Sequence, residues 1–248
     1  IIYSSNIGAA QIGRDMGSER QKQYLTALGM TTKPQIELPE VGQPMVPAKW
    51  KDINTLTIAF GHGIAVSPLQ LAIGTAATIN GGLLRPATFL KNENGTAGTR
   101  VLSEETSAMM RWLMRFNVQK GSGKRAEVAG YLVGGKTGTA EKLTGGKYAK
   151  NKRISSFVSA FPMDKPRYLV LVMMDEPKPP EATGGYATGS LVAAPIAGRI
   201  IARLGPLLGV APEAPEIAER DDDALIPVSV IGQTAGGKAI GGHSLASN

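Results

Sequence analysis

The sequence predicts an α+β domain, in which a helical subdomain precedes an antiparallel sheet covered by one last helix. Two observations lead to this fold class. Helix-start signals and helical spacing of apolar residues dominate up to residue 120, whereas residues 128–174 show the composition of strands. The links between these strands are also too short for parallel crossovers, which favours an antiparallel arrangement.

Two serine-led capping boxes mark helices in the first part of the chain. Ser18-Glu19-Arg20-Gln21 predicts a helix that starts at Ser18 and ends at Gly29. Ser67-Pro68-Leu69-Gln70 is the stronger signal, because proline fits the first helical position and Gln70 can close the box. This second helix should end at Gly81-Gly82.

A third helix should begin at Ser103, where two glutamates occupy the first turn, and should end at Gly121. It carries a stripe of methionines that is typical of core packing. Residues 31–50 contain four prolines and should form an irregular surface segment.

Three strands should follow, at Tyr131–Val133, Ile154–Phe161 and Tyr168–Met174. Residues 142–153 should be a long basic loop between the first two strands, and residues 162–166 a turn between the last two.

The last helix should run from Ser190 to Leu204, which places one domain at residues 1–210. Residues 211–248 are rich in Ala, Pro and Gly and contain six acids but two basic residues. Because this segment has little apolar periodicity, we expect a disordered tail.

The composition excludes several kinds of chemistry. The chain has no cysteine, so it has neither disulfides nor thiolate metal ligands. It has two histidines, of which His62 lies between glycines as a turn residue and His243 lies in the tail. A Ser-His-Asp triad is therefore not expected, and no histidine or carboxylate cluster has the spacing of metal ligands. We expect no metal and no cofactor.

The most informative stretch is Gly134–Ala140, which contains Lys136-Thr137-Gly138-Thr139 in a glycine-rich extended run. A second polar cluster, Ser4-Ser5-Asn6, lies far upstream. A Lys-Thr-Gly strand and a Ser-x-Asn loop are two thirds of a known catalytic set whose third part, Ser-x-x-Lys, supplies the nucleophile. No serine in these 248 residues is followed by lysine three positions later.

Lysine is then the remaining candidate for a general base or a stabilising charge, because burial can lower its pKa toward neutrality. Thr137 and Thr139 should point to the same face of a strand, where one carboxylate could accept hydrogen bonds from both. Gly138 should allow another backbone to approach closely. The alternative without a functional site is an ordinary edge strand whose threonines reflect β-propensity.

Two competing hypotheses use the same region. Gly130–Thr137 satisfies the phosphate-loop pattern Gly-x4-Gly-Lys-Thr, but the glycines and β-branched Thr139 that follow Thr137 disfavour the helix that a phosphate loop requires. Nucleic-acid binding would use the five basic residues Lys142, Lys147, Lys150, Lys152 and Arg153, which no recognition motif surrounds. We expect these basic residues to form a solvated loop and expect no nucleic-acid partner.

Four segments together resemble the transpeptidase domain of class B penicillin-binding proteins, most closely the division-specific type of Gram-negative bacteria. They are Ser4–Gly8, Phe60–Ala72, Gly135–Lys142 and Val192–Pro195. The resemblance covers residues 1–204 and implies the penicillin-binding/serine β-lactamase-like transpeptidase fold with its N-terminal part missing. In that family the nucleophilic serine and its paired lysine lie upstream of Ser-x-Asn, so we expect them to lie outside this chain.

The resemblance also implies roles for individual residues. Ser4 and Lys136 would be catalytic, Ser4 by relaying a proton to the leaving group and Lys136 by its positive field. Asn6 would bind the substrate backbone. Thr137 and Thr139 would hold the terminal carboxylate of a D-Ala-D-Ala stem peptide or of a β-lactam, and Gly138 between them would also belong to the substrate-binding residues. The Thr139 N–H would supply half of an oxyanion hole.

The implied activity is peptidoglycan D,D-transpeptidation in septal wall synthesis, at the periplasmic face of the inner membrane, with an N-terminal anchor outside this chain. The implied partners are stem peptides, β-lactams and membrane proteins of the divisome. A non-catalytic β-lactam sensor with the same fold remains an alternative.

Overall fold

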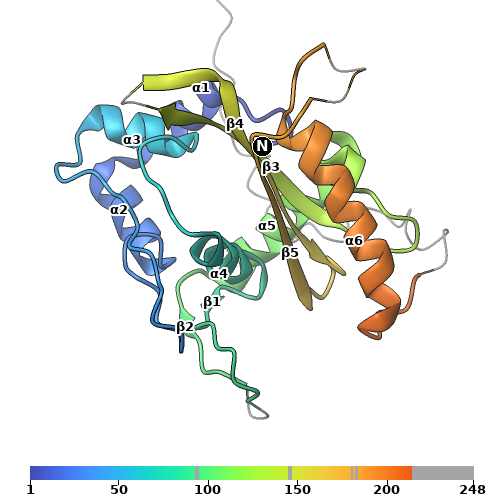
Figure 1. Cartoon of the computed structure of the whole chain (residues 1–248). Coiled ribbons are helices and arrows are strands. Elements are labelled where there is room, and N and C mark those ends of the chain that lie inside the picture. Colours follow the sequence, from blue (N-terminus) through green and yellow to red (C-terminus); the bar gives the residue numbers. More distant parts are fainter. Residues whose placement is uncertain (93–94, 145–146, 180, 182–183, 214–248) are drawn as a thin grey trace, which may run out of the picture.

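The computed structural model describes residues 1–92, 95–144, 147–179, 181 and 184–213. In this part of the chain, a lobe of three helices lies beside an antiparallel sheet with helices against both of its faces (Figure 1). The elements are α1 (Asn6–Met16), α2 (Ser18–Ala27), α3 (Asp52–Ala59), α4 (Pro68–Ile79), β1 (Leu83–Leu84), β2 (Thr99–Arg100), α5 (Glu104–Lys120), η1 (Lys124–Ala126), β3 (Gly134–Thr144), β4 (Lys147–Phe161), β5 (Tyr168–Asp175), η3 (Gly189–Ala193) and α6 (Ala194–Leu207). The predicted α+β class is confirmed. Most of the predicted disordered tail, residues 214–248, lies outside the described residues.

The capping box predicted at Ser18 is wrong. Gly17, with φ of 81°, is the N-cap of α2, and Ser18 is already its first helical residue. The side chain of Gln21 does not return to the helix start; its Nε2 donates to the buried Thr55 carbonyl on α3 at 2.9 Å. A tertiary contact therefore replaces the local box.

Helices α1 and α3 were not predicted, and they pack against each other to form the lobe. The two helices lie close together at Gly13, where an added Cβ would lie 2.7 Å from the Ala59 Cβ. The absence of a side chain at Gly13 thus allows the two helices to approach closely.

The helices predicted from Ser67 and Ser103 are confirmed. The Ser67 Oγ accepts from the Gln70 N–H at 3.2 Å, while the Gln70 Oε1 accepts from the Ser67 N–H at 3.0 Å, so the α4 box is complete. Ser103 caps α5, which ends at Gly121 as predicted. Met114 of the methionine stripe is buried, as expected of core packing.

The sheet has the order β3-β4-β5, and both neighbouring pairs are antiparallel. Two predicted boundaries are wrong. Residues 131–133, predicted as a strand, precede β3, which begins at Gly134. Their apolar character reflects burial, because Tyr131 and Val133 lie in the core. The predicted loop 142–153 instead continues the two strands, since β3 extends to Thr144 and β4 begins at Lys147.

β4 lies between two apolar clusters. Phe157 and Phe161 pack with α6 residues on one face, whereas Ala160 packs with Met114 of α5 on the other. Full burial of each phenylalanine contributes about 2–3 kcal/mol relative to exposure. The strand that carries the candidate Lys-Thr-Gly motif is hydrogen-bonded to this buried central strand.

The predicted last helix is observed with one π turn, η3, before α6. The continuous helix Gly189–Leu207 is long and apolar enough to cross a membrane by length and composition. Its buried residues Ala194, Ala197 and Ile201 belong to the core cluster against the sheet, which accounts for that composition.

Candidate active site

The candidate site lies where the N-terminal end of α1 meets β3. Ser5 is the N-cap of α1, and its Oγ accepts from the Gly8 N–H at 3.1 Å. Ser4, directly before the cap, has φ of 50°, a left-handed conformation that is uncommon outside glycine. The capped helix end therefore fixes a backbone in which the hydroxyl of Ser4 faces β3 rather than serving the helix.

Lys136 on β3 reaches Ser4 across this junction. Its Nζ donates to the Ser4 Oγ and, at 2.8 Å, to the Thr137 carbonyl oxygen. The structure thus brings together two predicted residues that are 132 positions apart in the chain. Because the lysine is half-buried, desolvation lowers its pKa from the ordinary value of 10.5.

The hydroxyl of Thr137 belongs to a chain of hydrogen bonds that the sequence did not indicate. The Thr137 Oγ1 lies 2.8 Å from the Ser122 Oγ, which in turn lies 3.2 Å from the Asn117 Oδ1. Asn117 is fully buried, and its Nδ2 donates to the Gly135 carbonyl at 2.8 Å. This bond leaves the Asn117 Oδ1 as the acceptor for Ser122.

The donor and the acceptor of each of these hydrogen bonds follow from the number of hydroxyl protons. Ser122 has one hydroxyl proton and gives it to Asn117, so Thr137 must donate its own proton to Ser122. The Thr137 proton therefore points toward Ser122 rather than toward the open edge of β3. Ser122 also ties the N-terminal segment to the site, because its N–H donates to the Ile2 carbonyl at 3.1 Å.

Thr139 is exposed, and its Oγ1 accepts from the Gly189 N–H at 3.0 Å. This bond leaves the hydroxyl proton of Thr139 free to donate to a ligand. The close approach expected at Gly138 is present: a Cβ on Gly189 would lie 2.5 Å from the Gly138 carbonyl oxygen. The segment before α6 thus packs directly on the Lys-Thr-Gly strand.

Asn6 is the first residue of α1 and is exposed, beside Ser4. Its side chain makes no hydrogen bond within the described residues, so its amide is available to a ligand. Lys136 and Thr139 offer a cation and a hydroxyl donor along the edge of β3, and Asn6 offers an amide from the adjoining start of α1. Such an edge can bind an extended peptide that ends in a carboxylate.

The phosphate-loop hypothesis for Gly130–Thr137 is not supported. The residues after Thr137 continue β3 to Thr144, so no helix N-terminus faces the glycine-rich run. Gly130, with φ of 80°, lies in the turn between Val128 and Tyr131 instead.

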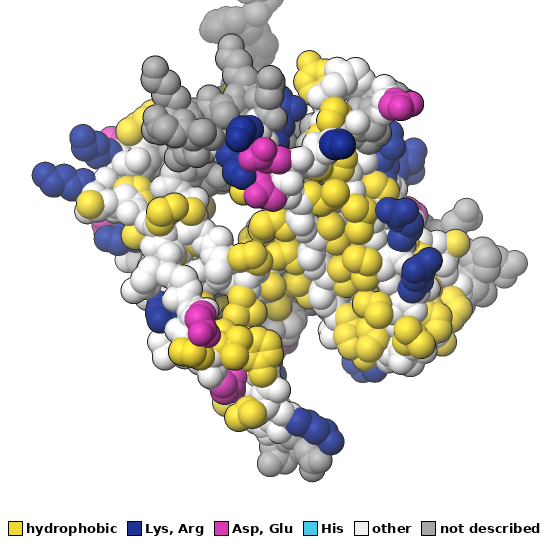
Figure 2. All heavy atoms as spheres, viewed as in Figure 1, with side chains coloured by type: hydrophobic (Ala, Val, Ile, Leu, Met, Phe, Trp, Pro, Cys, Tyr) yellow, Lys and Arg dark blue, Asp and Glu magenta, His cyan; other side chains and the backbone are white. Residues whose placement is uncertain are grey.

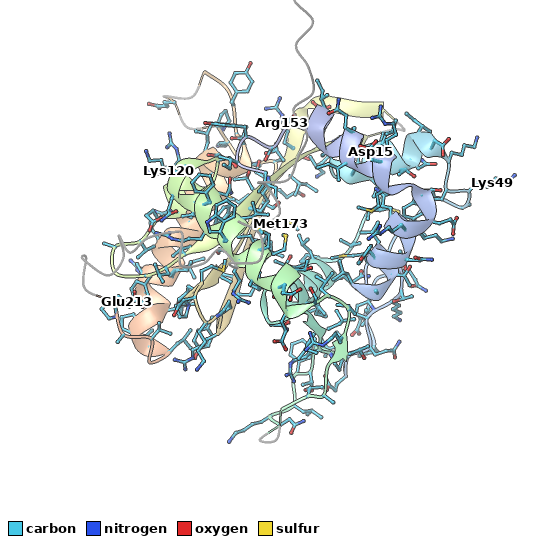
Figure 3. The ribbon with its side chains drawn as sticks, turned by 180° about the vertical axis from the view of Figure 1, so that it is seen from behind. Asp15, Lys49, Lys120, Arg153, Met173 and Glu213 are labelled. Carbon is cyan, nitrogen blue, oxygen red and sulfur yellow. The ribbon has the colours of Figure 1, made fainter. Side chains whose placement is uncertain are left out.

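The basic residues of the predicted loop are partly neutralised. The Lys142 Nζ contacts Asp175 at 2.8 Å and Glu176 at 2.9 Å, and these bonds raise its pKa. The Lys152 Nζ lies 3.7 Å from the same Glu176. Seen from behind, the labelled Arg153 lies toward the same end of the molecule as Lys120 at the end of α5 (Figure 3). The side chains of Lys147 and Lys150 are outside the described part of the structure.

No group of three or more His, Asp or Glu side chains that could hold a metal ion occurs among the described residues. His62 lies in a turn, where its N–H donates to the Thr57 carbonyl at 2.9 Å.

Comparison with known proteins identifies the kind of domain. A family model described as "Penicillin binding protein transpeptidase domain" matches residues 1–202. The chain is 46% identical over 219 residues to the "Probable peptidoglycan D,D-transpeptidase FtsI" of Caulobacter vibrioides, which covers 84% of this chain and 37% of the relative. It is 36% identical over 231 residues to "Stage V sporulation protein D" of Bacillus subtilis, covering 88% of this chain and 35% of that relative.

Solved structures agree with the sequence relatives. The transpeptidase domain of Burkholderia pseudomallei penicillin-binding protein 3 matches with a TM-score of 0.77 and 35% identity, covering 85% of this chain and 64% of that chain. Penicillin-binding protein 3 of Mycobacterium tuberculosis, solved in complex with ampicillin, matches with a TM-score of 0.76 and 26% identity, covering 86% and 51%. The chain therefore spans little more than a third of the length of these two curated relatives.

Proposed function

The chain belongs to the penicillin-binding protein transpeptidase family, and from this premise we propose that it forms the substrate-binding side of a peptidoglycan D,D-transpeptidase site. The observation that carries the proposal is the contact between the Lys136 ammonium and the Ser4 hydroxyl at the edge of β3. The substrate would be the D-Ala-D-Ala terminus of a stem peptide.

Each residue has a role that its surroundings support. The terminal carboxylate lies against the Lys136 ammonium and accepts from the free hydroxyl of Thr139. Donation from Thr137 as well requires Ser122 to turn its proton from Asn117 to Thr137. Asn6 binds the peptide backbone, and Gly138 leaves the strand edge open to the ligand.

The reaction is acyl transfer to a serine supplied by the complete protein. The serine oxygen attacks the carbonyl of the penultimate D-alanine while its proton passes to the lysine paired with it in the complete protein, and the peptide bond to the terminal D-alanine breaks. Ser4, hydrogen-bonded to Lys136, passes a proton to the departing amine. The Thr139 N–H stabilises the oxyanion, and an amine of a neighbouring stem peptide then attacks the acyl-enzyme to form the cross-link.

The same site would bind β-lactams, whose carboxylate takes the place of the peptide terminus. By analogy with the FtsI relative, we place the complete protein in septal wall synthesis at the periplasmic face of the inner membrane, held by an N-terminal anchor and working with other division proteins.

Two measurements on the 248-residue chain test the proposal. Without a Ser-x-x-Lys nucleophile, the chain should remain unlabelled by a fluorescent penicillin. It should still bind acetyl-D-Ala-D-Ala reversibly, as followed by NMR titration, and Lys136→Ala should weaken this binding about tenfold or more, because a charge-assisted hydrogen bond contributes about 1.5–3 kcal/mol. Stoichiometric labelling, or dipeptide binding that is indifferent to Lys136→Ala, would contradict the proposal.

A further inference from the structure

A basic surface lies outside the candidate active site, on η1 and α6. Lys124 and Arg125 of η1 are exposed, and so are Arg199 and Arg203 of α6. The two arginines are four residues apart in the helix, so they lie on the same side of it. Figure 2 shows Lys and Arg side chains spaced along the side of the molecule where α6 lies. We call these four residues the basic face.

The packing of η1 against α6 brings the two halves of the basic face together. A Cβ on Gly198 would lie 3.3 Å from the Ala126 carbonyl oxygen, so the backbones of the two elements are in direct contact. Arg125 directly precedes Ala126, and Arg199 directly follows Gly198. The four cations therefore lie around one contact between η1 and α6.

No carboxylate in the described part of the chain neutralises the basic face. The side chains of its four residues make neither an ion pair nor a hydrogen bond with any described residue. The neighbouring acid, Glu127, is engaged elsewhere, because its Oε2 lies 2.6 Å from the Nη1 of the buried Arg115. The basic face is therefore a cluster of like charges that a nearby anion would stabilise.

The C-terminal segment leaves the described fold close to η1. The Glu213 N–H donates to the Gly130 carbonyl at 2.8 Å, and a Cβ on Gly130 would lie 2.8 Å from the Pro212 Cβ. Gly130 is four residues from Ala126, so it lies within roughly 14 Å of η1. Figure 3 places Glu213 on the same side of the molecule as Lys120, the last residue of α5, which leads into η1.

The residues that follow Glu213 carry the opposite charge. Residues 214–223 contain five acids and one basic residue, which gives a net charge of −4 against the four cations of the basic face. An extended chain spans up to about 3.5 Å per residue, so Glu216 can lie up to roughly 10 Å from Glu213 and Asp223 up to roughly 35 Å. Arg199 and Arg203 are separated by roughly 6 Å along α6, so the whole basic face is within this reach.

We propose that residues 216–223 dock on the basic face of the same chain. Their carboxylates pair with the guanidinium and ammonium groups of the face and form a network of exposed ion pairs. Single pairs of this kind contribute little, but the short tether at Glu213 holds the acids at an effective concentration in the millimolar range. The kind of partner that fits this surface is an acidic peptide, and the chain supplies its own.

A spin label on the C-terminal segment tests this proposal in the 248-residue chain. The chain has no cysteine, so Ala224→Cys provides a unique attachment point for a nitroxide. At an ionic strength of about 0.01 M, the label should remove most of the intensity of the Ala126 and Gly198 amide signals and leave that of Ile58, in α3, unchanged. An ionic strength of about 1 M shortens the Debye length from about 30 to about 3 Å and should restore both signals.

Two pairs of charge reversals provide matched variants. Arg199→Glu combined with Arg203→Glu should restore the full Ala126 signal in the labelled chain at low salt. Lys22→Glu combined with Lys49→Glu makes the same change of charge at exposed positions and should leave the broadening in place. Figure 3 shows Lys49 on the opposite side of the molecule from Glu213.

Three results would overturn the proposal. The first is full intensity at Ala126 and Gly198 in the labelled chain at low salt, whether or not vesicles that contain phosphatidylglycerol shift these signals and so assign the face to a lipid surface. The second is broadening that is indifferent to the reversal of the two arginines. The third is equal broadening when the nitroxide is on one copy and the observed amides are on another, which would place the segment on a second molecule.

Discussion

Lys136 carries its positive charge in a half-buried position that favours the neutral amine. Its stem is half-buried at the edge of β3, and the ammonium is held by the Ser4 hydroxyl and the Thr137 carbonyl. Desolvation lowers its pKa below 10.5. Because the unfolded chain holds this proton more tightly than the folded one, the stability that Lys136 contributes increases as the pH rises from the folded pKa to 10.5.

This lowered pKa predicts a pH dependence of ligand binding. The affinity for acetyl-D-Ala-D-Ala should fall as the pH rises, with a midpoint below 10.5, because the neutral amine no longer attracts the carboxylate. Isothermal titration calorimetry at a series of pH values measures the midpoint. Lys136→Arg should lose this midpoint, since a guanidinium stays charged. An affinity that is constant up to pH 10.5 in the unaltered chain would contradict the assignment.

Removal of the Ser122 hydroxyl should lower the stability of the fold but should not weaken ligand binding. Ser122→Ala leaves the Asn117 Oδ1 buried without its partner, which should lower the free energy of unfolding by about 1–3 kcal/mol. The same change releases the Thr137 hydroxyl, so the dipeptide should bind at least as tightly as before. Urea denaturation and NMR titration measure the two quantities. Ser122→Thr keeps the hydroxyl and should restore most of the stability.

At the scale of elements, the two capping boxes provide a direct comparison. Ser67→Ala should destabilise the protein by about 1 kcal/mol, because the box at the start of α4 is complete. Ser18→Ala should change stability by less than about 0.5 kcal/mol, because the side chain of Ser18 does not cap α2. Equal losses in thermal denaturation would show that the box at Ser18 forms in solution.

This pair also shows which elements the sequence could predict. The helices led by Ser67 and Ser103 are determined by their own first turns, so local signals sufficed. At Ser18 the same signal failed, because Gly17 sets the start of α2 and Gln21 bonds Thr55, far away in the chain.

The residues of the candidate site also divide into those that the sequence could predict and those that it could not. Lys136, Thr139 and Ser4 could be found because their motifs are contiguous and resemble a known family. Ser122 could not, since its link to Thr137 exists only when the end of α5 packs beside β3. The β3–β4 hairpin was missed for a related reason: residues 142–153 have the composition of a loop, yet they continue two paired strands.

At the scale of the whole molecule, the sheet ends in an unprotected strand. β5 pairs with β4 along one edge, and in the part of the chain that the structure describes its other edge has no strand partner. Figure 2 shows hydrophobic side chains gathered over the centre of the face of the molecule that is seen in Figure 1, beside the opening between the lobe and the sheet. Figure 3 places Met173, which is 43% exposed, at the centre of the molecule. Such an edge favours strand pairing between copies.

The isolated chain should therefore self-associate as its concentration rises. Met173→Lys, which adds a charge to β5, should shift association to higher concentration by about tenfold. Size-exclusion chromatography with light scattering measures the effect. Leu207→Lys is the control, because Leu207 is 80% exposed at the end of α6, away from this edge. A monomer at all concentrations would argue against an adhesive β5 edge.

The close contact between α1 and α3 at Gly13 can influence the Ser4–Lys136 contact from a distance. Ser4 leads into α1 of the lobe and Lys136 lies on β3 of the sheet, so the contact between their side chains spans the junction of the lobe and the sheet. One methyl group at position 13 would wedge α1 away from Ala59, and the end of the helix would carry Ser4 with it. Ligand selectivity could thus be retuned by a substitution that no ligand ever touches.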